Sequence, residues 1–438
     1  MKKLSLLLLI LFVSCKTTKT ATEHVQSINY KSVKIYEQNS AFEYGPCEPS
    51  IFINPTNTNN IVAGSVMKNI HHSFDGGKTW QTKTMKSSLG VYGDPCITAD
   101  YQGNFYYFHL ADPENNGRSS KRFLESMVVQ KSTDGGKTWL DGTGIGKNKH
   151  PKQQDKEWSV VNPFNDEIYL TWTEFDKYGS NNKKHHSRIL FSKSTDGAKT
   201  WSDTKVLSEL EGDAMDDDKT VEGAVPAVGS QGEIYVSWAY NNKIYFDKSL
   251  DDGKSWLDKD IEVCNQPHGW NFNVPALSRV NGMPVTCVDL SNSKHKGTIY
   301  INFSDQRNGT KDTDIFLVKS VDNGDTWSTP LRVNTDKTKT HQFLTWMSVD
   351  SKTGYIYIVF YDRSKYKNNQ TDVVLAISKD GGNTFTNKTI SKKPFTPNTQ
   401  IFFGDYNNIS AHDGKIRPIW TAYYNNKLSV WTCLIDDK

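Results

Sequence analysis

Short runs of alternating hydrophobic and polar residues recur along the whole chain. The clearest run covers residues 232–238, and similar runs lie at 165–172, 297–303 and 354–360. Looser copies lie at 103–108 and 414–420. A period of two residues indicates a strand with one buried face. Because no helix-period segment of useful length follows the first 14 residues, the pattern predicts an all-β protein.

A second recurring signal is a short apolar strand that begins beside a polar or acidic residue. Seven copies can be counted, and two of them lie at 273–277 and 346–349. The other five begin at acidic residues, which are Glu48, Asp94, Glu157, Glu222 and Asp405. We expect one such strand in each of seven structural units.

Six stretches share a turn pattern that runs from Ser through Asp and a Gly-containing pair to Trp or Phe. They cover residues 73–80, 132–139, 194–201, 249–256, 320–327 and 378–385. Asp and Gly allow the backbone angles of a tight hairpin, and the Asp and Ser side chains can bond free N–H groups. We therefore expect the six aspartates to be structural, namely Asp75, Asp134, Asp196, Asp251, Asp322 and Asp380.

These six turns resemble the Asp-box, or BNR, repeat of sialidase-type β-propellers. The resemblance extends from residue 48 to the C-terminus, and the spacing of roughly 60 residues suits a four-stranded blade. Seven strand starts against six turns predict seven blades, with six as the alternative. The last unit has only three strands, so we expect residues 32–36 to complete it and close the ring. The predicted propeller domain covers residues 31–438.

The N-terminus has the pattern of an export signal. Lys2 and Lys3 precede an apolar run over residues 4–13, and Cys15 follows it directly after Ser14. This arrangement resembles a bacterial lipobox, so residues 1–14 are interpreted as a lipoprotein signal peptide and Cys15 as the lipidated residue. An ordinary signal peptide is the alternative. Residues 15–30 would form a flexible tether, and the lipid would be the only membrane contact, in the cell envelope and at the outer membrane.

Composition narrows the choice of partners. The chain of 438 residues has 52 basic and 49 acidic residues, a net charge of +3, which gives no case for nucleic acid binding. Five further cysteines match no zinc motif; Cys47–Cys96 or Cys264–Cys287 could pair, or all could be buried thiols. No cofactor or metal site is predicted, and calcium in the acidic loop 213–218 is the one alternative left open.

A propeller usually binds its ligand at the axial mouth, where the innermost strands begin. Acids gathered there could raise one another's pKa and supply a proton donor and a base. They could equally cap strand ends or hold a cation.

The resemblance to sialidases implies three kinds of group. An arginine cluster binds the substrate carboxylate, a Tyr with an acidic partner attacks the anomeric carbon, and an Asp acts as acid and base. On this basis Tyr406, beside Asp405, is the nucleophile, Glu222 its activating base and Asp94 the acid. Arg307 and Arg363, with Glu48, are the substrate-binding residues. The early Arg-Ile-Pro element of sialidases is absent, and the nearest early arginines, Arg118 and Arg122, lie in a polar loop.

The sequence therefore predicts a sialidase-like propeller that binds acidic envelope or environmental glycans and cleaves them as an exo-glycosidase. A non-catalytic scaffold or polysaccharide-capture protein is one alternative. A propeller-type polysaccharide lyase, which would use His and Tyr, is the other.

Overall fold

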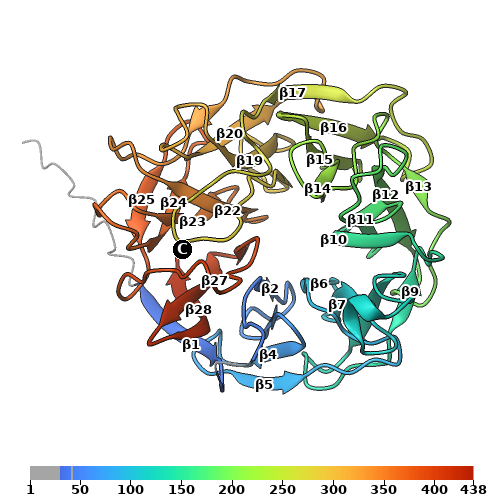
Figure 1. Ribbon diagram of the computed structural model, residues 1–438. Helices are drawn as coiled ribbons and strands as arrows, with labels where there is room; N and C mark the ends of the chain where they lie inside the picture. Colours follow the sequence, from blue (N-terminus) through green and yellow to red (C-terminus); the bar gives the residue numbers. More distant parts are fainter. Residues whose placement is uncertain (1–29, 41–42, 438) are drawn as a thin grey trace, which may run out of the picture.

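The protein is a ring of seven four-stranded antiparallel sheets around a central axis (Figure 1). The computed structural model describes residues 30–40 and 43–437. The predicted seven blades are confirmed, and the six-blade alternative is excluded. The signal peptide, Cys15 and residues 16–29 of the tether lie outside the described residues.

Each blade uses consecutive strands, except the last. Blade 7 has the order β1-β28-β27-β26, so the N-terminal strand is its outermost member and closes the ring as predicted (Figure 1). This blade lacks a repeated turn because its outer two strands come from opposite ends of the chain, which explains six turns for seven blades.

The strands of the seven blades have the following bounds. Blade 1 is β2 (Ser50–Ile53), β3 (Ile61–Ser65), β4 (Asn69–Ser73) and β5 (Gln81–Thr84); blade 2 is β6 (Cys96–Ala99), β7 (Phe105–Leu110), β8 (Met127–Ser132) and β9 (Thr143–Ile145); blade 3 is β10 (Gln153–Val161), β11 (Ile168–Phe175), β12 (Ser187–Ser194) and β13 (Lys205–Val206); blade 4 is β14 (Glu222–Val228), β15 (Ile234–Tyr240), β16 (Lys243–Ser249) and β17 (Ile261–Asn265). Blade 5 is β18 (Val285–Val288), β19 (Ile299–Asp305), β20 (Asp314–Ser320) and β21 (Leu331–Arg332); blade 6 is β22 (Gln342–Val349), β23 (Ile356–Asp362), β24 (Asp372–Ser378) and β25 (Thr386–Thr389); blade 7 is β26 (Asn408–His412), β27 (Lys415–Tyr424), β28 (Lys427–Asp436) and β1 (Lys31–Glu37).

Helical structure is confined, within this described part, to the short 3-10 helix η1 (Gly117–Ser119). The described residues contain no helix long and apolar enough to cross a membrane. All five cysteines of the described chain are free thiols.

The core lies between neighbouring sheets. The second strand of each blade is almost wholly buried, because it is covered on both faces by the adjacent blades. Trp172, Trp238 and Trp420 occupy this strand in blades 3, 4 and 7, and each is less than 2% exposed. Large aromatic side chains fill the wedge between sheets that diverge from the axis.

The six repeated turns lie between the third and fourth strands, at the end of the blades opposite the starts of the innermost strands. We call these two ends the turn end and the mouth end. In one turn, Asp134 Oδ1 accepts hydrogen bonds from the amides of Lys137 and Thr138 at 3.0 and 2.9 Å, and Oδ2 accepts the Thr138 hydroxyl at 2.6 Å. Partial burial raises the pKa of Asp134, but these bonds outweigh it and lower the pKa to about 2. The carboxylates are therefore occupied by the turns themselves.

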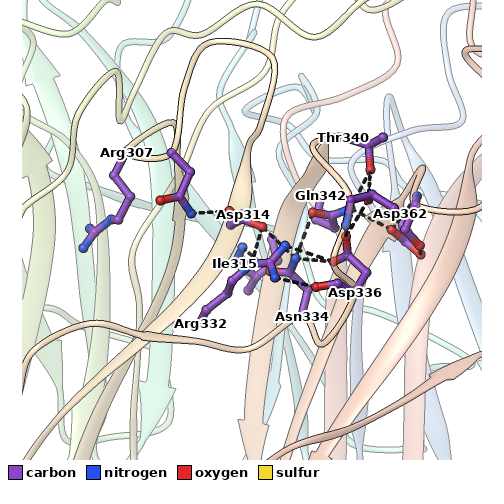
Figure 2. A network of polar contacts seen from close by, with 12 residues as sticks. Arg307, Asp314, Ile315, Arg332, Asn334, Asp336, Thr340, Gln342 and Asp362 are labelled. Atoms are coloured by element: carbon purple, nitrogen blue, oxygen red, sulfur yellow. Dashed lines mark hydrogen bonds and ion pairs between the residues drawn. The ribbon is translucent and has the colours of Figure 1, made fainter. Parts of the chain in front are cut away.

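Buried polar contacts join blades 5 and 6 at their mouth ends (Figure 2). Asn334 donates through Nδ2 to Asp314 Oδ1 at 2.7 Å and to Gln342 Oε1 at 2.9 Å. Gln342 in turn donates to Asp362 Oδ1 at 2.9 Å. Because these four side chains are buried, satisfying them in one network fixes the register between the two blades.

An aromatic plug divides the axial channel. The rings of Trp158 and Trp346 have centroids 4.1 Å apart, and Tyr406 packs edge-on against Trp158 at 4.9 Å. Toward the turn end, a channel of about 230 Å³ is lined mainly by aliphatic residues of the innermost strands. Toward the mouth end, the axis is occupied by charged residues.

Candidate active site at the mouth of the propeller

A long loop over residues 266–284, between β17 and β18, packs across the mouth; we call it the mouth loop. Six of its apolar side chains are buried, Trp270, Phe272, Val274, Leu277, Val280 and Met283. Asp218 accepts the backbone amides of Trp270 and Asn271 at 3.1 and 2.8 Å. On the opposite side, Arg363 donates to the carbonyl of Pro275 at 2.8 Å.

The open part of the mouth is a cavity of about 380 Å³, which we call the mouth cavity. It lies on the side of blades 1 to 3, with the mouth loop contributing Ser278 and Arg279 to its wall. Its polar lining consists of the acids Glu48, Asp94 and Asp155 with the cations Arg118, Lys156 and Arg279, and its aromatic lining of Tyr44, Tyr92, Phe123, Tyr178 and Phe402.

Three charged residues reach this cavity from the same strand position. In blades 1, 2 and 3, regular pairing of the innermost strand with the second strand starts at Ser50, Cys96 and Trp158. Two residues before these positions lie Glu48, Asp94 and Lys156. All three have left-handed backbone conformations, with φ of 49°, 48° and 55°. Non-glycine residues held in this region cost free energy and concentrate at functional sites.

The sequence analysis placed Glu157 at this position in blade 3, and the structure corrects that alignment. A β-bulge between Asp155 and Trp158 shifts the ladder, so Lys156 is the equivalent of Glu48 and Asp94. The bulge turns the side chains of Asp155 and Lys156 into the cavity. Glu157 is 2% exposed and does not line it.

The floor is a buried group of ion pairs that spans the mouth. Lys156 Nζ lies 2.8 Å from Asp405 Oδ2 and 3.5 Å from Asp94 Oδ2. Arg279 binds Asp405 with two nitrogens, one of them Nε at 2.8 Å from Oδ1, and Asp216 Oδ2 through Nη1 at 2.6 Å. Burial raises the pKa of Asp405, but the Arg279 and Lys156 charges outweigh it and hold that pKa well below its usual range. Asp405 is therefore an ionised anchor.

Burial raises the pKa of two further carboxyl groups of the site. Burial raises the pKa of Asp155 to about 8, with Lys156 opposing and Asp94 reinforcing the shift. Burial and the charges of Asp94 and Asp405 likewise raise the pKa of Glu48 well above its usual value. At neutral pH Asp155 thus carries a proton at the cavity wall, which is the property of a general acid.

Tyr178 lines the cavity and pairs with the carboxylate of Asp216, which does not line it. The Tyr178 hydroxyl donates to Asp216 Oδ2 at 2.5 Å, and the Arg118 guanidinium lies 5.7 Å from the centre of the Tyr178 ring. Arg118 makes no ion pair with any described residue, and its side chain is exposed. The sequence analysis did not select Tyr178 or Asp216, because both lie in loops without a strand pattern; the acidic loop 213–218 was the only signal.

The predicted catalytic residues separate in the structure. Tyr406 is 4% exposed, packs in the aromatic plug and does not line the mouth cavity. Burial raises its pKa well above the usual value. Glu222 is fully buried; burial and the neighbouring Asp216 raise its pKa. Of the predicted set, Glu48 and Asp94 line the cavity, and Asp405 forms ion pairs beneath it.

The predicted substrate-binding arginines do not reach the cavity. Arg307 pairs with Asp305, the last residue of β19, at 2.5 Å and lies 4.2 Å from the ring centre of Phe316. Figure 2 shows its guanidinium directed away from the Asp314 network. Arg363 is buried, donates to Thr371 Oγ1 at 3.0 Å and anchors the mouth loop through Pro275. Burial lowers the pKa of Arg363 to about 10.

A metal centre is not formed by these residues. Among the described residues, no group of three or more His, Cys, Asp or Glu side chains is arranged to hold a metal ion. The acidic loop 213–218, which the sequence left open for calcium, instead directs Asp216 and Asp218 to the mouth loop.

No protein-family model matches the chain. Its fold is similar to that of several solved structures. An ulvan lyase of polysaccharide lyase family PL25 has a TM-score of 0.56 and 14% identity, with 92% of this chain and 96% of that chain covered. The NanB sialidase of Streptococcus pneumoniae has a TM-score of 0.51 and 10% identity, with 85% and 83% covered. A protein of unknown function from Dyadobacter fermentans has a TM-score of 0.50 and 14% identity, with 93% and 99% covered.

These structures share the propeller fold with the present chain. At 10 to 14% identity the likeness extends to the fold alone. Two of the three are named as a polysaccharide lyase and a sialidase.

Proposed function

We propose that this propeller binds the end of an anionic glycan in the mouth cavity and hydrolyses the terminal glycosidic bond. The observation that supports it most is that Tyr178, Asp155 and the unpaired cation Arg118 line one open cavity, with the Tyr178 hydroxyl donating to Asp216 and the pKa of Asp155 raised to about 8 by burial. Arg118 would hold the acidic group of the sugar, because a guanidinium matches the geometry of a carboxylate or sulfate.

The three groups can be given balanced roles in a two-step reaction. Tyr178 Oη attacks the anomeric carbon while its proton passes to Asp216, the anomeric C–O bond breaks, and Asp155 protonates the departing oxygen. In the second step, Asp155 removes a proton from water, the water oxygen attacks the anomeric carbon, the bond between that carbon and Tyr178 Oη breaks, and Asp216 returns the proton to the released phenolate. This scheme replaces Tyr406 and Glu222 by Tyr178 and Asp216, and Asp94 by Asp155, at a cavity that substrate can enter.

Burial of the Tyr178 hydroxyl and the adjacent Asp216 carboxylate raise the pKa of Tyr178 above its usual value. The neutral phenol is thus the resting form, and Asp216 must accept its proton during attack. Arg279 lies on the other side of Asp216 and fixes the carboxylate toward Tyr178. It is a positioning residue in this scheme.

Two features favour hydrolysis over the alternatives. A scaffold would be expected to fill its mouth with packed side chains, whereas this mouth has a cavity of about 380 Å³. A lyase of the expected kind would present a His–Tyr pair in a basic groove, whereas no histidine lines the mouth cavity and its acids equal its cations in number.

The proposal is tested by incubating the purified propeller, residues 30–438, with sialosides, uronate-containing oligosaccharides and sulfated oligosaccharides. We expect new reducing ends without ultraviolet absorbance from an unsaturated uronate. Absorbance from such a product would instead identify a lyase, and binding without any product would identify a capture protein.

We also propose, from the sequence, that the protein is anchored in the bacterial envelope by a lipid on Cys15. The first strand begins at Lys31 on the turn end of blade 7, since Lys31 pairs with Leu434 near the end of β28. The mouth cavity would then face away from the anchor. Replacing Cys15 by Ser should move the protein from the membrane fraction to the soluble fraction; unchanged membrane association would refute the anchor.

A further inference from the structure

A layered stack of side chains rises from the charged floor of the mouth cavity to its rim. The Arg279 guanidinium lies 5.8 Å from the ring centre of Phe402. Tyr44 stacks on Phe402 with ring centroids 5.9 Å apart and an interplanar angle of 17°. Arg279 comes from the mouth loop, Phe402 from the segment between β25 and β26, and Tyr44 from the segment before β2, and all three line the cavity.

Tyr44 presents its ring to solvent. It is 57% exposed, and of the four exposed aromatic side chains in the described part of the chain it alone lines the mouth cavity. A large aromatic ring left open to water carries an unfavourable hydration free energy that burial would recover. Phe402 stacks against the other face of the ring, and Arg279 lies beyond Phe402.

Phe402 lies over a cation that is itself held in place. Arg279 is fixed by its ion pairs with Asp405 and Asp216, and its guanidinium lies beneath the Phe402 ring. The aromatic surface therefore costs little conformational entropy when it receives a ligand.

We propose that the Tyr44–Phe402 pair is a binding subsite for the second sugar of the glycan, next to the terminal sugar held over the charged floor. The apolar C–H face of a pyranose ring packs on an aromatic face, whereas the hydroxyl groups at its edge stay in water. The charged floor and Arg118 suit an anionic terminal sugar, and the aromatic rim suits an uncharged face of the next one. This inference rests on the proposed function, since it assumes a glycan in the mouth cavity.

The subsite predicts that recognition depends on chain length. Monosaccharides would contact only the floor, whereas disaccharides and longer fragments would also cover Tyr44. The gain from one aromatic contact corresponds to about a fivefold to tenfold increase in affinity.

The test is binding of the purified propeller to a printed array of sialylated, uronate-containing and sulfated glycans, each as a monosaccharide, disaccharide and tetrasaccharide. We expect Tyr44→Ala to weaken binding of the longer fragments about fivefold to tenfold and to leave monosaccharide binding unchanged. Tyr44→Phe should retain the gain, because it keeps the ring. Tyr101→Ala, at an aromatic residue 37% exposed at the turn end, is the matched control and should change nothing.

The outcomes separate this inference from the proposed function. Glycan binding by the wild-type protein with no loss in Tyr44→Ala, or with equal loss at every length, would overturn the subsite and leave the mouth cavity as the glycan site. Absence of binding to every glycan by the wild-type protein would overturn both. Because Tyr44 is largely exposed, its replacement should not impair folding, and an unchanged melting temperature would verify this.

Discussion

Lys156 of blade 3 and Asp405 of blade 7 meet across the mouth of the propeller, with Nζ and Oδ2 2.8 Å apart. Both side chains are nearly fully buried, at 4% and 1% exposure. The pair links two blades that are not neighbours in the ring, and Asp405 also binds Arg279 of the mouth loop. The site is thus braced by charge as well as by packing.

Removal of one partner should therefore be costly. We expect Lys156→Met to lower the free energy of unfolding by about 3 kcal/mol, because it leaves Asp405 and Asp94 with less buried positive charge. Urea denaturation would measure the change. The exposed pair Lys34–Glu37 provides the control, and Lys34→Met should cost less than about 1 kcal/mol. Equal effects of the two variants would contradict the bracing role of Lys156.

The raised pKa of Asp155 predicts a pH dependence of stability. Burial raises this pKa from 3.8 to about 8, so the folded state binds a proton that the unfolded state releases between these values. The contribution to stability is fully present below pH 3.8 and is lost as the pH rises to about 8. The slope can reach about 1.4 kcal/mol per pH unit.

Asp155→Asn should therefore flatten the decline of unfolding free energy between pH 4 and 8, relative to the wild-type protein. Denaturant titrations at several pH values would measure it. Glu48, Asp94, Lys156 and Asp216 face the same site, and burial also raises the pKa of Glu48, so the comparison is between the two slopes. Parallel slopes would show that Asp155 is ionised in the folded protein.

Two arginines should respond in opposite ways to replacement. Arg118→Ala is expected to weaken binding of anionic glycans about tenfold or more, by loss of a charge-assisted contact, with little change in stability. Arg363→Ala should lower stability instead, because it releases the Pro275 carbonyl of the mouth loop. Glycan affinity and melting temperature should be measured on both variants. A loss of affinity without a loss of stability in Arg363→Ala would show that Arg363 binds substrate, as the sequence predicted, and would contradict this account.

The architecture was predictable because it is repeated. The turn pattern occurs six times and the strand start seven times. Each copy alone is a weak signal, but together they indicate the number of blades. The closing strand β1 followed from the shortage of one strand in the last unit. These are properties of local sequence, which periodicity reports directly.

The site was predictable only in its location. Glu48 and Asp94 were found because they precede regular strands, but the bulge at Asp155 and Lys156 moved the equivalent position in blade 3 by one residue. Tyr178 and Asp216 lie in loops whose conformation depends on distant partners, such as Arg279. Arg307 and Arg363 had the right residue type. Arg307 is paired with Asp305, only two residues before it, whereas the contact of Arg363 with Pro275 is tertiary and leaves no sequence pattern.

The most direct test of the catalytic proposal is the rate of glycoside hydrolysis by Tyr178→Phe compared with Tyr406→Phe, on whichever anionic substrate the wild-type protein cleaves. Both changes remove one hydroxyl from a tyrosine, but only Tyr178 lines the mouth cavity. We predict that Tyr178→Phe lowers kcat by about 10³-fold or more with its fold intact, and that Tyr406→Phe stays within about threefold of the wild-type rate. Full activity in Tyr178→Phe, or loss of activity in Tyr406→Phe alone, would contradict the account.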